Sequence, residues 1–210
     1  MTAPPPVRDS PAAGSVIGIV LAAGAGRRLG RPKADVVLGG RRLVDRAVAT
    51  LLDGGCTEVL AVLRPGQAPA SGARTVVNPE PDSGMGSSLR CALAEAGESD
   101  ACVVLLADLV GVRPAEVAEV IARHRAGAEI VAVRRAGQRS HPVLVGRRWY
   151  AEFAAAAVGA HPDHGGRAFF DRHADETSFL DYPDPLADID TPEDLRRAVA
   201  AEQTAVEAVD

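Results

Sequence analysis

Short apolar runs alternate with longer amphipathic stretches along most of this chain, and turns rich in Gly and Pro separate them. The apolar runs have the length and β-branched content of buried strands. They lie at Val16–Ala22, Glu58–Leu63, Arg74–Val77, Ala101–Ala107 and Glu129–Arg134. Strands that alternate with helical patterns are typical of a mainly parallel α/β sheet.

The amphipathic stretches predict helices between these strands. Gly54 and Gly55 end the first helix, and Pro114 suits the first turn of a later one. The last helix has the clearest start, with Thr191 as N-cap, Pro192 at the first helical position and two acidic residues favoured by the helix dipole. The expected helices are Leu43–Leu52, one from near Gly86 to Ala96, one from Pro114, Arg148–Val158, Gly165–His173 and one from Pro192.

The Gly137 turn joins the strand at Glu129–Arg134 to a further apolar run at His141–Val145. This pair is predicted to form an antiparallel hairpin appended to the parallel sheet. The fold class expected is a single Rossmann-like α/β domain over residues 16–210, with helices on both sheet faces and a small antiparallel element. Residues 1–15 are rich in Pro and Ala and are expected to form a disordered tail.

The amino-acid composition argues against several classes of function. A net charge of −5 with 3% aromatic residues argues against nucleic-acid binding, which generally needs a basic surface and stacking platforms. The longest apolar stretches are too short to span a bilayer, so no membrane partner is expected. Cys56, Cys91 and Cys102 lack metal-type spacing and suit reduced thiols in the cytoplasm. Lys33 is the only lysine among the 23 basic residues.

Lys33 ends a loop that is well suited to phosphate. Gly24, Gly26 and Gly30 allow backbone amides to approach an anion, and Arg27, Arg28, Arg31 and Lys33 supply positive charge. The loop follows the first strand and therefore lies at the carboxyl edge of the sheet, where α/β proteins bind ligands. Its glycine spacing matches neither a dinucleotide fingerprint nor a P-loop, and an ordinary flexible turn is the alternative.

Two acidic segments are predicted to reach the same edge. Asp108 directly follows the buried strand Ala101–Ala107, and alternation places Asp188 and Asp190 on one face of a short extended segment. Carboxylates at these positions suit Mg²⁺. Alternatively, Asp188 is a turn residue and Asp190 belongs to the segment that caps the last helix.

Two further segments are candidates for ligand contacts. The polar loop from Asn78 to Leu89 opens a helix and offers Gly84, Ser87 and Ser88 to a ligand, although both serines could equally be N-caps. The turn at His141 and Pro142 is a candidate substrate contact, or His141 is a satisfied histidine beside a strand. The cluster from His161 to His164 is expected not to bind a metal.

Together these segments identify a family. The chain resembles the MobA-like nucleotidyltransferases of molybdenum-cofactor biosynthesis, and within them the molybdenum cofactor cytidylyltransferases. The resemblance spans Val16 to about Ala200. It rests on the run from Leu21 to Lys33, on Asn78 with Gly84–Leu89, on Asp108 at its strand end, on His141-Pro142-Val143 and on Asp188–Leu195.

The resemblance implies a role for each segment. The glycine loop would wrap a nucleoside triphosphate, with Lys33 on its phosphates, and Asp108 and Asp190 would hold Mg²⁺ as cofactor. Lys33, Asp108 and Arg28 are the predicted catalytic residues, and His141 with Pro142 would lie near the second substrate. The predicted nucleotide-binding residues are Leu21, Ala22, Ala23, Gly24, Gly26, Arg27, Gly30, Lys33, Asn78, Gly84, Ser87 and Ser88.

The implied reaction transfers CMP from CTP to molybdopterin cofactor, since Ala23 in Leu-Ala-Ala-Gly resembles the cytidylyl-transferring version of the motif. Leu109 and Val110 depart from the Gln and Pro that the cytidylyltransferases usually carry there. Similar sequences include nicotine blue oxidoreductases, so an NAD(P)H-dependent oxidoreductase is one alternative. A guanylyltransferase, or another sugar or cofactor nucleotidyltransferase, is a second. A further expectation is a protein partner, either a molybdoenzyme or its maturation chaperone.

Overall fold

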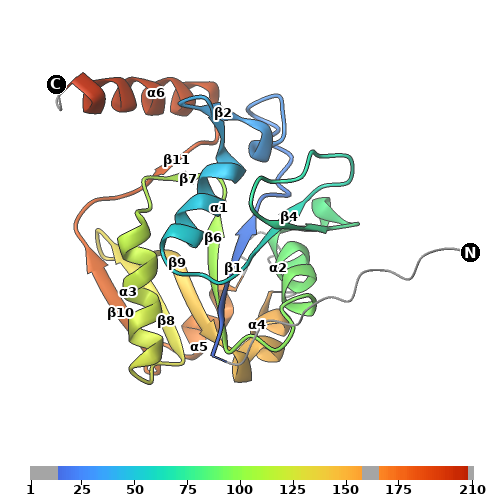
Figure 1. The fold of residues 1–210 in the computed structure, drawn as a ribbon, viewed down its shortest axis with the longest axis vertical. Helices are drawn as coiled ribbons and strands as arrows, with labels where there is room; N and C mark the ends of the chain where they lie inside the picture. Colours follow the sequence, from blue (N-terminus) through green and yellow to red (C-terminus); the bar gives the residue numbers. More distant parts are fainter. Residues whose placement is uncertain (1–13, 158–165, 208–210) are drawn as a thin grey trace, which may run out of the picture.

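Seven strands form the central sheet of the computed structural model, which describes residues 14–157 and 166–207 (Figure 1). The sheet order is β10-β8-β9-β6-β1-β4-β5. The strands are β1 (Val16–Leu21), β4 (Val59–Leu63), β5 (Arg74–Val77), β6 (Ala101–Leu106), β8 (Ile130–Arg135), β9 (Gln138–Gly146) and β10 (Thr177–Tyr182).

The sheet is mostly parallel, as the alternating pattern predicts. β1 pairs in parallel with both β4 and β6, whereas β9 runs antiparallel to both β6 and β8. The predicted hairpin of β8 and β9 is therefore confirmed, but it is not appended to the sheet, because β9 lies inside it. Its register shifts between Ala132 and Val133, so that His141 and Pro142 are bulged out of the ladder.

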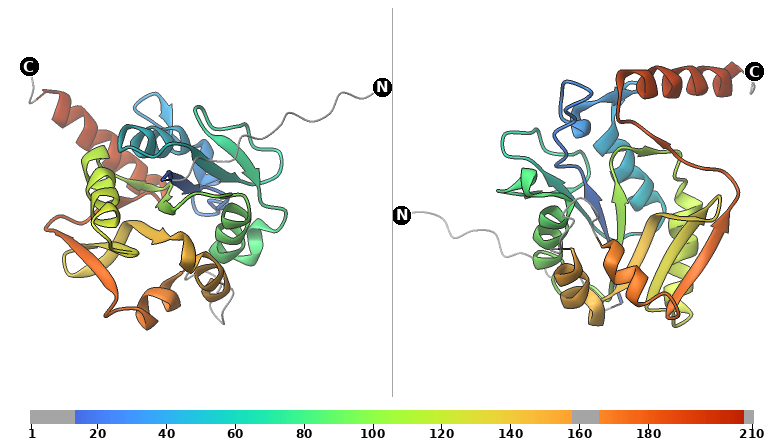
Figure 2. Two further views of the ribbon diagram at one scale, coloured as in Figure 1. Left: turned by 60° about the horizontal axis from the view of Figure 1, so that its bottom comes forward. Right: turned by 180° about the vertical axis from the view of Figure 1, so that it is seen from behind.

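Helices cover both faces of the sheet (Figure 2). On one face α1 (Leu43–Asp53) and α3 (Pro114–Arg125) pack into a core that includes Val20, Leu51, Leu105 and Val117. On the other face the core contains Ile19, Leu89, Phe153 and Phe169. The helices there are α2 (Met85–Ala94), α4 (Tyr150–Ala156) and α5 (Arg167–Arg172).

Gly86 shows how closely two of these helices approach. A Cβ atom at Gly86 would lie 1.7 Å from the carbonyl oxygen of Ala157, at the end of α4. Only glycine fits this contact. Gly86 therefore serves the packing of α2 against α4.

Two short antiparallel sheets and the last helix, α6 (Pro192–Glu207), complete the described residues. β2 (Val37–Leu38) pairs with β3 (Arg41–Arg42), and β7 (Leu109–Val110) pairs with β11 (Ala187–Asp188). Single turns of 3₁₀ helix occur as η1 (Lys33–Asp35), η2 (Pro81–Ser83) and η3 (Arg147–Trp149). α6 lies at the top of Figure 1, beside β2.

The start of α6 is built as predicted. The Thr191 hydroxyl accepts a hydrogen bond from the Asp194 amide at 3.2 Å, and the Asp194 carboxylate accepts one from the Thr191 amide at 2.8 Å. This reciprocal pair is a capping box. The expected structural role of Asp194 is confirmed.

Strand β10 has no counterpart among the predicted elements, because its residues Thr177–Tyr182 mix polar and aromatic types without an apolar run. Most of the expected N-terminal tail, and the histidine cluster at 161–164, lie outside the described residues; Ser15 is described and is buried. Within the described ranges, no helix is both long and apolar enough to cross a membrane.

Candidate functional site

A cavity of about 430 Å³ opens where β1 and β6 end, between the glycine loop and the start of α2. The glycine loop, residues 21–33, forms one wall, and Pro81, Asp82, Gly84, Met85 and Ser88 form the other. Asp108 follows β6 and lies on the cavity floor. The predicted residues that line this cavity are Leu21, Ala22, Ala23, Gly24, Gly26, Arg27, Lys33, Gly84, Ser88 and Asp108.

The glycine loop holds its shape through its own backbone. The Leu29 amide donates to the Gly26 carbonyl at 2.9 Å, and the Lys33 amide donates to the Gly24 carbonyl at 3.4 Å. Gly26 has φ +58°, and a Cβ atom there would lie 1.9 Å from the Arg31 carbonyl oxygen. Gly26 is therefore required by the fold of the loop itself.

Lys33 and three carboxylates converge at the edge of the cavity. The Lys33 ammonium donates to Asp108 and to Asp190 and lies 3.8 Å from an oxygen of Asp188. The pairing of β7 with β11 places Leu109 opposite Asp188, and the Ile189 amide donates to the Asp108 carbonyl at 3.1 Å. This small sheet brings segments about 80 residues apart in the chain to one point.

The charges in this cluster influence one another strongly. Burial lowers the pKa of Lys33, but Asp108 and Asp190 raise it by more, so the ammonium stays protonated. Burial and the neighbouring Asp108 raise the pKa of Asp188 to about 6. One oxygen from each of the three carboxylates lies within 4.8 Å of the others. Hard oxygen donors at this spacing fit a divalent cation such as Mg²⁺.

The loop before α2 is braced from inside by Asn78. This fully buried side chain donates to the hydroxyls of Ser87 at 2.7 Å and Ser88 at 3.0 Å, and its oxygen accepts from the Glu80 amide at 2.9 Å. Both serines lie within α2, whose N-cap is Gly84, so neither is an N-cap. Asn78 therefore supports the cavity wall from inside the protein, but its own side chain does not line the cavity.

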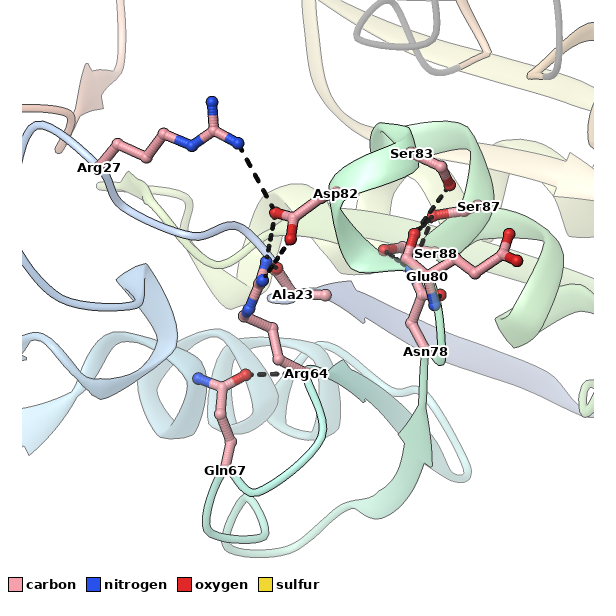
Figure 3. A network of polar contacts seen from close by, with 10 residues as sticks. All are labelled: Ala23, Arg27, Arg64, Gln67, Asn78, Glu80, Asp82, Ser83, Ser87 and Ser88. Carbon is pink, nitrogen blue, oxygen red and sulfur yellow. Dashed lines mark hydrogen bonds and ion pairs between the residues drawn. The ribbon is translucent and has the colours of Figure 1, made fainter.

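Arg64, at the end of β4, connects the two walls (Figure 3). Its guanidinium donates to the Ala23 carbonyl at 3.0 Å and to the two oxygens of Asp82 at 3.1 and 2.8 Å. Arg27 approaches the same carboxylate at 4.0 Å. The hydrogen bond from Arg64 is the main reason that the pKa of Asp82 lies below its usual value.

A second cavity of about 650 Å³ adjoins the first, and Leu21 and Met85 line both. Its apolar part includes Phe153 and Phe170, and its polar rim consists of Gln138, Arg139, Ser140, His141, Arg167 and Asp171. The His141 ring contacts the Val104 carbonyl at 3.2 Å, and burial lowers its pKa. His141 thus lies where a second substrate could meet the first cavity, while Pro142 lines neither cavity.

The structure also separates residues that the sequence grouped together. Arg28 and Gly30 belong to the glycine loop but are exposed and do not line the cavity, and Ser87 lies behind it. Sequence reasoning did not select Arg64, Asp82 or Met85. Asp82 could have been noted, because it lies in the same polar loop as Gly84; Arg64 gave no signal, because its partners are distant along the chain.

Comparison with known proteins agrees with this geometry. The MobA-like NTP transferase domain family matches residues 18–177. The nicotine blue oxidoreductase of Paenarthrobacter nicotinovorans is 36% identical over 197 residues, which cover 87% of this chain and 95% of that protein. The molybdenum cofactor guanylyltransferase of Rhizobium meliloti (strain 1021) is 27% identical over 201 residues, covering 87% of this chain and 89% of that one.

The fold is also similar to solved structures. The crystal structure of Rv0371c from Mycobacterium tuberculosis H37Rv superimposes with a TM-score of 0.76 at 25% identity, covering 89% of this chain and 98% of that one. This similarity covers most of the chain and shows that the two proteins share the fold.

Proposed function

The chain belongs to the MobA-like NTP transferase family, and from this premise we propose that it transfers CMP from CTP to the terminal phosphate of molybdopterin cofactor, releasing pyrophosphate. One observation carries the proposal. The only lysine of the chain meets Asp108 and Asp190 at the edge of a cavity walled by the glycine loop. This arrangement provides positive charge and metal-binding oxygens beside a site for phosphates.

The proposed reaction requires the protein mainly to position the two substrates and to neutralise charge on the phosphates. A phosphate monoester has a second pKa of about 6, so the attacking oxygen of the acceptor is already ionised at neutral pH. A general base is therefore not required. Lys33 and the amides of the glycine loop would hold the triphosphate and stabilise the charge on the departing pyrophosphate.

Asp108 and Asp190 would hold Mg²⁺, with Asp188 close enough to complete the ligand set. When bound, the ion supplies charge neutralisation at the α-phosphate. Arg27 lies on the cavity wall with a mostly exposed side chain, so it is free to turn towards the phosphates. Arg28 would have to approach from outside the cavity.

The acceptor would enter through the second cavity, beside His141 and the bulge at Pro142. Because the two cavities share Leu21 and Met85, an acceptor phosphate there can approach a nucleotide in the first. CTP is proposed as donor because Ala23 matches the cytidylyl-transferring version of the motif. Asn78 and Ser87 then act on the nucleotide indirectly, through the loop that they brace.

Two relatives support other activities. The 36% identical protein of Paenarthrobacter nicotinovorans is named an oxidoreductase, which makes reduction of an aromatic substrate by NAD(P)H the second candidate. The relative from Rhizobium meliloti is named a guanylyltransferase, so GTP is the alternative donor nucleotide.

Three free thiols, Cys56, Cys91 and Cys102, support a cytoplasmic location. A molybdoenzyme or its chaperone would receive the product there.

Pyrophosphate release tests the proposal directly. The protein is incubated with Mg²⁺ and CTP, GTP, ATP or UTP, each with and without molybdopterin cofactor. Release that requires both CTP and the cofactor is expected. Release with GTP alone would overturn the assignment from Ala23. NAD(P)H oxidation with a quinone-like acceptor, and no pyrophosphate under any condition, would favour the oxidoreductase.

A further inference from the structure

Each of the two walls of the first cavity is held together by its own hydrogen bonds. The glycine loop is closed by backbone hydrogen bonds at Gly24 and Gly26. The opposite wall, Asn78–Ser88, is held by the buried Asn78 amide and by the Ser87 hydroxyl, whose single proton is shared between the Glu80 and Gly84 carbonyls, 3.0 and 2.8 Å away. The cavity can therefore change its width only if the two walls move relative to each other.

Arg64 joins these walls although it belongs to neither. It follows β4, donates to Ala23 on one wall and binds both oxygens of Asp82 on the other (Figure 3). The planar guanidinium holds its donors in a fixed geometry, so its contacts with Ala23 and Asp82 set the separation of these two partners. The backbone of Arg64 is itself held, because its amide donates to the Gln67 side chain at 2.7 Å.

We propose that Arg64 is a positioning residue that sets the width of the nucleotide cavity and thereby selects pyrimidine over purine triphosphates. The inference rests on the proposed function, since it requires that a nucleoside lies between the Ala23 and Asp82 walls. Selection by a fixed width excludes the larger base through a steric clash. The hydrogen bond from Arg64 favours the ionised form of Asp82 and lowers its pKa, as expected for a paired carboxylate.

The clamp predicts a change in selectivity when it is broken. In Arg64→Met an unbranched apolar stem remains, but it donates to neither Ala23 nor Asp82, and the walls can separate. Asp82 is exposed, so solvent screens its ion pair with Arg64, and losing the pair changes a binding ratio by roughly a few fold. We expect the preference for CTP and UTP over GTP and ATP to fall by roughly a few fold, with both purine nucleotides changing together.

Isothermal titration calorimetry with Mg²⁺ and each nucleotide, without acceptor, measures these affinities on the whole chain. The matched control is Arg74→Met, because Arg74 also binds two acidic residues, Glu58 at 2.6 Å and Glu95 at 2.8 Å, away from the cavity. This control should keep the wild-type ratio. Asp82→Asn breaks the same clamp from the other wall and should match Arg64→Met, and the double variant should be no less selective than either single variant.

The outcomes distinguish the two proposals. A wild-type protein that binds none of the four nucleotides overturns the proposed function, and this inference with it. A selective wild-type protein whose Arg64→Met and Asp82→Asn variants are folded and equally selective overturns the clamp alone. Equal weakening of all four nucleotides would also overturn it, because that result indicates a structural role without size selection.

Discussion

Lys33 connects the glycine loop of the candidate site with the carboxylates of Asp108 and Asp190. It belongs to the glycine loop, yet its ammonium lies among carboxylates that follow β6 and β11, far away along the chain. A lysine suits this place because its charge is compact and its stem flexible, so that it can pair with carboxylates or with phosphate oxygens. An arginine, with its rigid planar fork, could not exchange these partners as readily.

Removing this charge should impair turnover far more than folding. We expect Lys33→Ala, and separately Asp108→Asn, to lower the rate of pyrophosphate release on the order of 10² or more, as for the loss of one preorganised electrostatic contact. Steady-state assays with CTP and molybdopterin cofactor measure the effect, and thermal denaturation checks the fold. Arg31→Ala is the control, since Arg31 is an exposed cation of the same loop that does not line the cavity. Near-normal turnover in both site variants would contradict the assignment.

At the scale of elements, α4 and α5 form one wall of the second cavity, and the turn between α5 and β10 is bound to them. His173 holds them together: one ring nitrogen contacts Glu152 of α4 and the other contacts Glu176, both at 2.9 Å. The ring also packs against Trp149, with centroids 4.6 Å apart. Hydrogen bonds to these two carboxylates raise the pKa of His173 above the ordinary value of 6.5.

This shift makes stability depend on pH in a definite direction. A histidine whose pKa is raised on folding stabilises the protein fully below its unfolded pKa, near 6.5, and the contribution is lost as pH rises through the higher folded value. The melting temperature of the wild type should therefore exceed that of His173→Gln by more at pH 6 than at pH 9. His124→Gln is the control variant, because it leaves both contacts of His173 in place. An unchanged profile in His173→Gln would refute this account.

At the scale of the whole molecule, a third apolar cluster joins the segments of the candidate site to the C-terminal helix. Ile189 is fully buried between Asp188 and Asp190 and packs with Val36, Leu38, Leu43 and Ala198. Leu29 of the glycine loop and Val110 beyond Asp108 pack against the same cluster. The carboxylates are therefore held in place by a core to which the glycine loop, β2, α1 and α6 all contribute.

Truncation of Ile189 should destabilise the fold as a whole. Ile189→Ala removes a side chain with 0% exposure, and such changes cost about 2–5 kcal/mol of unfolding free energy. Urea denaturation followed by circular dichroism measures the loss. Val199→Ala is the control, because Val199 lies on α6 with 37% exposure, and it should cost well under half as much. Similar losses in the two variants would show that the cluster is not a true core.

Much of this organisation could be predicted from local pattern. The strands at Val16 and Ala101, the N-cap at Thr191 and the glycine loop all depend on neighbours within a few residues, and each lies where the pattern placed it. The hairpin of β8 and β9 was recognised for the same reason. The position of β9 between β8 and β6 was not predicted, because strand order depends on pairings between distant segments.

The sequence by itself determined the alternation of strands and helices, the edge of the sheet at which ligands would bind, and the presence there of Lys33, Asp108 and Asp190. Only the tertiary structure decided which polar residues face the cavity. It turned Asn78 inward, left Arg28 outside and placed Arg64 between Ala23 and Asp82. The physical reason is that backbone pattern is local, whereas a side chain's partners depend on how distant segments pack.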